Sequence, residues 1–291
     1  MAAGSGRREH NRVVDPHRDA VAHFRRMHRE GCFLIPNPWD AGSAIALAQL
    51  GFPALAMTSA GLSFARGLPD AVTALSVDDA LNNIADIVAA VGVPVNADFQ
   101  AGYASDVGEL ADNVARCVAT GVAGLSIEDG TGSGSAPLFE LAEAADRIRA
   151  ARSAIDDSGT DVMLTGRAEC FLYGHPDPLA EAIRRLQAYA EAGAEVLFAP
   201  GIRRKEDIAT LVDAVRPYPV NVLVSSDTGL TVTDLARLGV RRISVGSAFS
   251  RVAWGAFLAA ARQLIEDGSF AGLAGASSFD ELNGLFTERS R

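Results

Sequence analysis

Cysteine and histidine are scarce in this sequence. Its three cysteines, Cys32, Cys117 and Cys170, lie far apart, no CxxC pair occurs, and the five histidines form no cluster. A disulfide framework or a structural zinc site needs such residues at close spacing, so neither is expected. This usage suits a reducing compartment, and a cytoplasmic location is expected.

Long apolar runs and an excess of positive charge are absent as well. No run reaches the ~18–20 apolar residues of a membrane span, and residues 1–12 lack the apolar stretch of a signal peptide. The formal net charge of −10 disfavours nucleic acid and anionic membranes as partners. An anionic substrate would therefore need a locally positive pocket.

The chain does contain a regular alternation of short apolar runs and helical patterns. Its 291 residues are 48% apolar and 21% charged, a globular balance and an ordinary length for an α/β barrel. Glycines follow several of the helical patterns, as they do at helix ends. The strand-like runs cover residues 32–36, 54–58, 93–98, 123–128, 162–167, 196–199, 220–225 and 242–245. Helices are expected at 41–50, 77–90, 105–120, 140–154, 178–192, 204–215 and 232–238.

Eight strand–helix units of this kind predict a closed parallel (β/α)8 TIM barrel. A doubly wound open sheet is the alternative, but the first strand is followed by "PNPWDAGSA" rather than by a GxGxxG loop. We expect residues 1–15 to be a flexible basic tail and 16–291 to be one barrel domain. A leading helix at 17–29 would close its bottom, and extra C-terminal helices begin at about 252, with 252–266 and 279–286 as their ranges.

Acidic residues end the third and fourth strands, where barrels of this type carry their chemistry. Asp98 and Glu128 could share one Mg²⁺, since neighbouring strands lie ~4.8 Å apart and this ion takes carboxylate oxygens and water. Asn96 lies on the same face as Asp98 and could contribute its carbonyl oxygen. The alternative is that these acids cap the helices that follow.

Arg167 ends the fifth strand after a run that should be buried. A buried guanidinium needs an anionic partner, either a substrate carboxylate or phosphate, or an ion pair with Glu169 or Glu128. The small residues of "TSAGLS" at 58–63 could cradle an anion with backbone N–H groups, or only allow a tight turn.

Taken together, these stretches resemble the isocitrate lyase/phosphoenolpyruvate mutase superfamily. The resemblance covers roughly residues 30–260, in order and at the expected spacing. Four stretches carry it: "NPWDAGSAIALAQLGFPALAMTSAGLSFARGLPD" (37–70), "VPVNADFQAGYA" (93–104), "GVAGLSIED" (121–129) and "GRAECF" (166–171).

The resemblance implies a Mg²⁺ enzyme, with Mn²⁺ as the alternative ion, that acts on a small 2-oxo or 2-hydroxy carboxylate through an enolate. By position, Asp98, Glu128 and Asn96 would surround the metal. Asp70 would lie beside it, and Arg167 would clamp the substrate carboxylate. Further substrate contacts would come from Thr58, Ser59, Ala60, Trp39 and Asp40. Members of the superfamily form dimers or tetramers, so a homodimer or homotetramer is expected.

Three departures from the family pattern limit the specific reaction. Asn96 replaces the first acid of an Asp-x-Asp pair, and "LFAPG" at 197–201 replaces polar residues found in several members. The loop "DGTGSGSAPLFE" (129–140) has no Lys, Cys or His, although the family's reaction-specific residues lie there. An ordinary isocitrate or methylisocitrate lyase and a phosphoenolpyruvate mutase are therefore not expected. The loop is predicted to be a lid that excludes water.

The proton donor must then come from elsewhere. Glu169 is the first candidate, and the others are Asp227, Ser225, Ser226, Tyr103 and His175. The leading hypothesis is a lyase that works by decarboxylation or retro-aldol cleavage. Two alternatives stay open: a hydrolase or P–C bond enzyme of the same superfamily, and a catalytically silent carboxylate-binding barrel.

Overall fold

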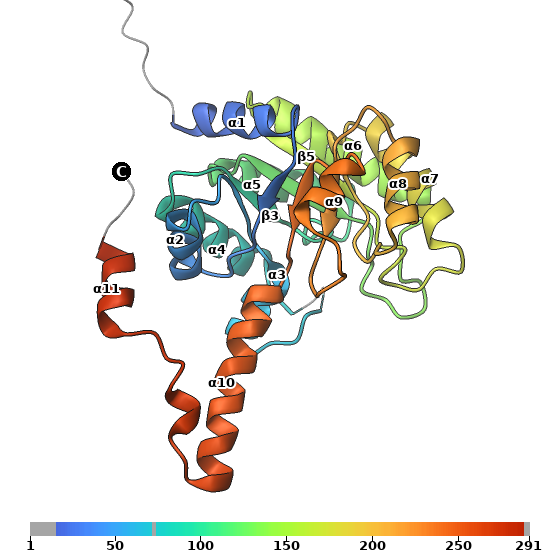
Figure 1. The fold of residues 1–291 in the computed structure, drawn as a ribbon. Coiled ribbons are helices and arrows are strands. Elements are labelled where there is room, and N and C mark those ends of the chain that lie inside the picture. The colour runs from blue at the N-terminus through green and yellow to red at the C-terminus, as the bar shows by residue number, and fades with distance from the viewer. Residues whose placement is uncertain (1–15, 72–73, 288–291) are drawn as a thin grey trace, which may run out of the picture.

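The computed structural model describes residues 16–71 and 74–287, so the predicted tail at 1–15 lies outside the described residues. Its eight strands follow the predicted order, each trimmed by one to three residues (Figure 1). They are β1 (Phe33–Ile35), β2 (Leu55–Ala56), β3 (Val95–Asp98), β4 (Gly124–Glu128), β5 (Met163–Arg167), β6 (Val196–Phe198), β7 (Val220–Leu223) and β8 (Arg242–Ser244).

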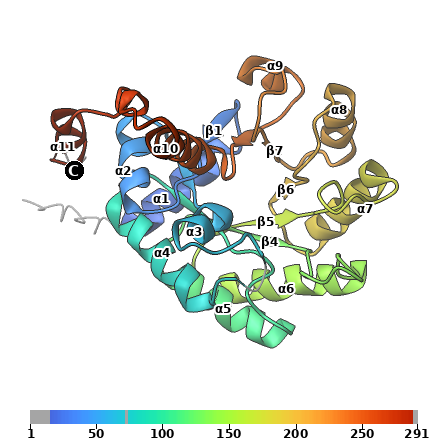
Figure 2. The same ribbon diagram turned by 90° about the horizontal axis from the view of Figure 1, so that it is seen from below.

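The strands form a parallel sheet in the order β1-β8-β7-β6-β5-β4-β3-β2, which curls into the predicted (β/α)8 barrel. Figure 2 shows the helices as a ring around the strands. β1 and β2 share no ladder, but two backbone hydrogen bonds join them just past the end of β1. Ala56 N donates to Pro36 O at 3.0 Å, and Thr58 N donates to Pro38 O at 3.1 Å. These bonds hold the two edge strands together where the barrel would otherwise open.

The helices also agree closely with the sequence pattern. They are α1 (Pro16–Met27), α2 (Ala41–Gln49), α3 (Ser59–Ala65), α4 (Val77–Ala90), α5 (Val107–Ala119), α6 (Leu141–Asp157), α7 (Pro178–Glu191), α8 (Lys205–Ala214), α9 (Val232–Arg237), α10 (Ala248–Asp267), the 3-10 turn η1 (Ala271–Leu273) and α11 (Phe279–Thr287). Two elements, α3 and η1, were not predicted. α10 begins four residues before the expected 252 and extends away from the barrel (Figure 1). None of the described helices is long and apolar enough to cross a membrane.

The bottom of the barrel is closed by α1, as the sequence predicts. Phe24 of α1 is fully buried, and β4 has a glycine, Gly124, where a Cβ would lie 2.7 Å from the Phe24 ring. His28, just after α1, packs edge-on against both Phe24 and Phe33. The missing side chain at Gly124 therefore makes room for the helix that closes this end.

Burial of His28 should make the protein acid-sensitive. Desolvation, followed by the charge of Arg242, lowers the pKa of His28 from 6.5 to about 3. Below pH 6.5 the unfolded chain binds a proton that the folded state refuses, so the free energy of unfolding falls as the pH falls towards 3. The parent should lose roughly 1.4 kcal/mol of unfolding free energy through His28 for each pH unit between 6.5 and about 3, and His28→Gln should abolish this contribution.

Urea unfolding at pH 7.5 and 4.5 measures the effect. Exposed His23 lies on α1 and supplies the matched control His23→Gln, which should keep the parental pH dependence. Equal slopes for parent and His28→Gln would contradict the assignment.

Candidate active site

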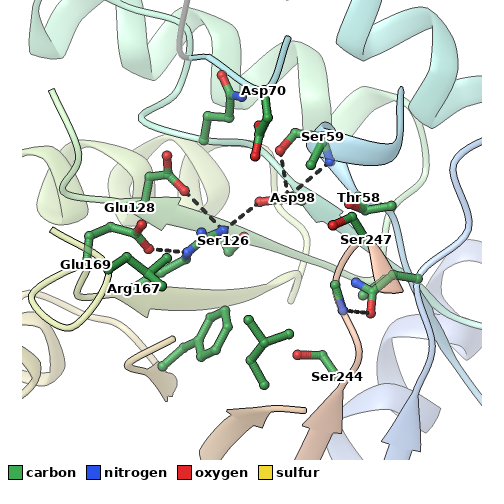
Figure 3. A pocket seen from close by; sticks show the side chains of 18 of the residues that line it. Thr58, Ser59, Asp70, Asp98, Ser126, Glu128, Arg167, Glu169, Ser244 and Ser247 are labelled. Carbon is green, nitrogen blue, oxygen red and sulfur yellow. Dashed lines mark hydrogen bonds and ion pairs between the residues drawn. The ribbon is translucent and has the colours of Figure 1, made fainter. Parts of the chain in front are cut away.

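A cavity of about 690 Å³ opens at the carboxyl ends of the strands, the edge at which TIM barrels carry their active sites. Its walls hold most of the predicted site residues (Figure 3). They are Thr58, Ser59, Ala60, Asp70, Asn96, Asp98, Glu128, Arg167 and Glu169.

Arg167 is the centre of the charged cluster in this cavity. Its Nη1 lies 3.2 Å from Asp98 Oδ1 and 3.1 Å from Glu128 Oε2, and its Nε donates to Glu169. The strand register explains this, because Glu128 and Arg167 are direct neighbours across β4 and β5. The sequence left open an ion pair with Glu128 or with Glu169, and the structure has both, with Asp98 as a third partner.

Asp98 is held from the other side by the start of α3. The backbone N–H and hydroxyl of Ser59 both donate to Asp98 Oδ2, at 3.1 and 2.9 Å. Thr58 is the N-cap of α3, since its hydroxyl accepts from Gly61 N at 3.3 Å. The 58–63 segment is therefore a helix start rather than an open turn. The anion that it binds in this structure is the Asp98 carboxylate.

The two consecutive acids at the end of β4 have different surroundings. Glu128 lines the cavity, whereas Asp129 is buried against α7, where it accepts from Arg185 at 3.0 Å and from the Tyr189 hydroxyl at 2.6 Å. Its other oxygen accepts from the backbone N–H of Glu169 at 2.8 Å. Asp129 thus fixes the backbone that carries Glu169. Side-chain alternation along the strand is the signal that separates the two roles.

The cavity holds more negative than positive charge around Arg167. Burial raises the pKa of Glu128, and the charges of Glu169 and Asp98 raise it further, against the opposing charge of Arg167. Burial, with a smaller contribution from Asp98, also raises the pKa of Asp70. The pKa of Glu169 is raised chiefly by burial. Four carboxylates around one guanidinium would be stabilised by a further cation.

A cation bound here would need water among its ligands. Within residues 16–71 and 74–287, no three Asp, Glu, His or Cys side chains gather closely enough to hold a metal by themselves. Mg²⁺ tolerates this, because it commonly takes one or two carboxylates and keeps several waters. The donor set, hard carboxylate oxygens in excess of their counter-charge, therefore fits Mg²⁺ or Mn²⁺.

The loop after β4 lies at the cavity as the predicted lid should. Gly132, Ser133, Gly134 and Pro137 contribute to the cavity wall. The loop is shaped by its own hydrogen bonds, including Thr131 N to Pro137 O at 2.9 Å and Ser133 N to Thr131 Oγ1 at 2.9 Å. It brings serine hydroxyls to the cavity but no acid or base that titrates near neutral pH.

Tyr173 is a cavity residue that the sequence analysis missed. It lies in the loop between β5 and α7 and lines the cavity beside Glu169 and Leu172. Burial and the charges of Glu169 and Glu128 raise the pKa of its phenol, so the hydroxyl keeps its proton. Tyr173 lies in a loop six positions past the end of β5, where the sequence has no helical or strand periodicity that indicates the direction of a side chain. The search for functional residues at strand ends therefore does not find it.

Several predicted residues are not brought to this cavity. Asp40 caps α2 by accepting from Ser43 N at 2.7 Å. Trp39 lines a separate apolar pocket with Trp254 and Phe257. Of the other proton-donor candidates, Asp227 accepts from Gly229 N in an exposed turn, and the buried Tyr103 hydroxyl has no hydrogen-bond partner among the described residues.

Comparisons with known proteins agree with this architecture. The family model described as phosphoenolpyruvate phosphomutase matches residues 24–265. The 2-methylisocitrate lyase of Escherichia coli is 31% identical over 76% of this chain and 75% of its own length. The oxaloacetate decarboxylase of Paraburkholderia xenovorans is 28% identical over 76% of this chain and 73% of its own. The structure of a presumed lyase/mutase of Burkholderia cenocepacia J2315 superposes with a TM-score of 0.90 at 42% identity, covering 94% of this chain and 98% of that one.

Proposed function

Since this chain belongs to the phosphoenolpyruvate phosphomutase family, within the isocitrate lyase/phosphoenolpyruvate mutase superfamily, we propose that it cleaves a carbon–carbon bond in a small 2-oxo or 2-hydroxy carboxylic acid. One observation carries the proposal: the cluster of Asp98, Glu128 and Glu169 around Arg167 inside the cavity at the barrel mouth. Named relatives that catalyse lyase reactions support the reaction class.

Asp98 and Glu128, with Asp70 beside them, would hold a Mg²⁺ ion in this cluster. When bound, the ion supplies Lewis-acid stabilisation of the negative charge that develops on a substrate oxygen during cleavage. Arg167 is fixed by three carboxylates and adds a positive charge at the same place. The lid and the barrel wall would exclude bulk water, so that the enolate takes its proton from a positioned group of the protein.

The lid brings no proton donor, so the donor must come from the remaining wall. Tyr173 fits, because its neutral phenol lines the cavity. We expect Tyr173→Phe to lower kcat by about 10²-fold, the usual contribution of a positioned general acid, with a small change in KM. The matched control is Tyr103→Phe, which removes a buried hydroxyl that has no partner among the described residues.

Steady-state kinetics of both variants over pH 6–9 provide the measurement. A parental kcat for Tyr173→Phe, or a larger loss for Tyr103→Phe, would assign the donor to another residue.

Turnover tests the proposed function directly. Parent enzyme with Mg²⁺ would be given a panel of 2-oxo and 2-hydroxy di- and tricarboxylates, and release of pyruvate, glyoxylate or CO2 would be followed. Product from one substrate that disappears on chelation with EDTA is the expected result. Product that contains the oxygen of labelled solvent water in a new carboxylate would favour the hydrolytic alternative. Tight binding of pyruvate or oxalate without any product would favour a carboxylate-binding barrel.

A homo-oligomer is the second part of the proposal. α10 exposes large apolar side chains along its length, including Val252, Phe257 and Ile265 at 68%, 60% and 85% of their surface. Beyond it, Phe270 and Phe279 are 72% and 87% exposed. A second copy of the chain is the simplest occupant for so much apolar surface on a helix that extends from the barrel (Figure 1).

The double variant Phe257→Asp/Ile265→Asp should therefore lower the native mass to that of a monomer. Thr210→Asp, an acid placed on the exposed face of α8, is the matched control and should keep the parental mass. Mass photometry distinguishes the two states. A parental mass for the double variant would mean that α10 does not form the subunit contact.

A further inference from the structure

A second arginine, Arg242, lies deep in the same cavity. It is the first residue of β8, only 3% of its surface is exposed, and it lines the cavity together with Asn96, Asn221 and Ser244. Because β8 begins at Arg242, this side chain enters the barrel below the mouth where Arg167 lies. The cavity therefore connects the partly exposed guanidinium of Arg167 at the mouth with the buried guanidinium of Arg242 below it.

The partners of Arg242 are all neutral. Its Nε donates to Asn221 Oδ1 at 2.9 Å and its Nη2 to Thr165 Oγ1 at 3.2 Å. Its Nη1 has only longer contacts, at 3.5 Å, with Asn96 Oδ1 and His28 Nε2. No acidic side chain lies within ion-pair distance of Arg242 in the described part of the chain. Nη2 uses one of its two N–H groups in the hydrogen bond to Thr165.

His28 is neutral as well, and its tautomer follows from its other contact. Nδ1 lies 2.8 Å from the carbonyl oxygen of Phe24, so Nδ1 carries the proton and donates it there. Nε2 then faces Arg242 as a bare acceptor. These contacts use part of the hydrogen-bonding capacity of the guanidinium, but they provide no counter-ion for its positive charge.

The two arginines of the cavity thus differ in charge balance. Arg167 is matched by three carboxylates, whereas Arg242 has none among the described residues. A buried charge without a counter-ion is costly, and desolvation lowers the pKa of Arg242 to about 9. An anion that enters the cavity is repelled by the acidic cluster at the mouth and attracted to the unpaired guanidinium below it.

We propose that the base of the cavity is an anion subsite in which Arg242 binds a carboxylate group. Its wall is polar: Ser244 and Asn221 lie next to Arg242, and Asn221 Nδ2 donates to Ser244 Oγ at 3.0 Å. The carboxylate belongs either to the substrate of the cavity or to a separate small anion. The subsite does not depend on the chemistry proposed above, because it concerns binding alone.

Calorimetric titration of the parent with sodium formate, at constant ionic strength, tests the subsite. We expect saturable binding that weakens at least tenfold in Arg242→Gln. Arg241→Gln is the matched control, since Arg241 is the preceding residue, carries the same charge and donates to Gly31 O outside the cavity. It should bind formate within twofold of the parent. No saturable binding by the folded parent, or equal affinity in Arg242→Gln, would overturn the proposal.

A second variant keeps the test decisive if Arg242→Gln does not fold. Asn96→Asp places a carboxylate next to Arg242 Nη1, so the protein supplies its own counter-ion. We expect this variant to bind formate at least tenfold more weakly than the parent and to melt at a higher temperature. Parental formate affinity in Asn96→Asp would contradict the subsite.

Crystals grown in sodium bromide locate the anion, because bromide scatters anomalously. A peak beside the Arg242 guanidinium supports the proposal, and peaks confined to the protein surface or to Arg167 contradict it. Competition then identifies the source of the carboxylate. If pyruvate displaces formate, the substrate carboxylate occupies the subsite; if both bind together, a separate anion does. Failure of turnover with formate binding intact would affect only the proposed function.

Discussion

Replacement of Asp98 by asparagine is expected to lower kcat/KM by about 10³-fold. Asp98 contacts both Arg167 Nη1 and the N-terminus of α3 through Ser59. Asparagine has the same shape and can still accept from Ser59, so the fold should be kept. What is lost is the negative charge that Arg167 and a bound divalent cation would share.

Asp40→Asn is the matched control for this prediction. Asp40 caps α2 outside the cavity, and asparagine caps helices about as well as aspartate does. Initial rates with the active substrate of the panel and saturating Mg²⁺ give the comparison. Near-parental rates in Asp98→Asn would place the reaction elsewhere. A large loss in Asp40→Asn would restore the substrate role that the sequence assigned to this residue.

The fold could be predicted because its signals are local and repeated. Eight apolar runs separated by helical patterns determine the barrel, and glycines such as Gly51 and Gly121, both at positive φ, follow helices where expected. The sequence does not predict α3, because four of the six residues of "TSAGLS" are Thr, Ser or Gly, which are weak helix formers. The N-cap at Thr58 and the hydrogen bonds from Ser59 to Asp98 stabilise the helix. Ser59 and Asp98 are 39 positions apart in the sequence, so a local pattern does not reveal their contact.

The site was predictable wherever strand direction alone places a side chain. Asp98, Glu128 and Arg167 each end a strand, so all three reach the same barrel mouth. Trp39 and Asp40 lie beyond a strand end, where loop geometry decides the direction, and neither lines the cavity. Arg242 begins a strand rather than ends one, so strand direction alone does not place it at the barrel mouth. The available signal was a charged residue at an inward-facing strand position, opposite Asn221 in the register of β7 and β8.

Arg167 should carry the largest effect on stability. Replacing it by methionine keeps much of the side-chain volume but removes the guanidinium that pairs with Asp98, Glu128 and Glu169. Loss of one partner from a buried ion pair typically costs about 3–5 kcal/mol, because the other charge stays buried. We expect the free energy of unfolding of Arg167→Met, measured by urea unfolding at pH 8, to be lower than that of the parent by this amount. The variant should also be inactive.

The pH dependence of Arg167→Met tests the reason for that loss. The pKa of Glu128 is about 8 in the parent and removing Arg167 raises it further, so above pH 8 the folded variant keeps a proton that the folded parent releases. A raised folded pKa gives stability that is complete below the unfolded value and is lost as the pH rises through the folded value, so this loss continues to higher pH in the variant. The deficit of Arg167→Met should therefore be larger at pH 9.5 than at pH 7. Arg184→Met removes an exposed surface pair with Glu181 and should cost less than about 1 kcal/mol at both pH values. A deficit that does not change with pH would mean that lost packing, rather than uncompensated charge, explains the instability.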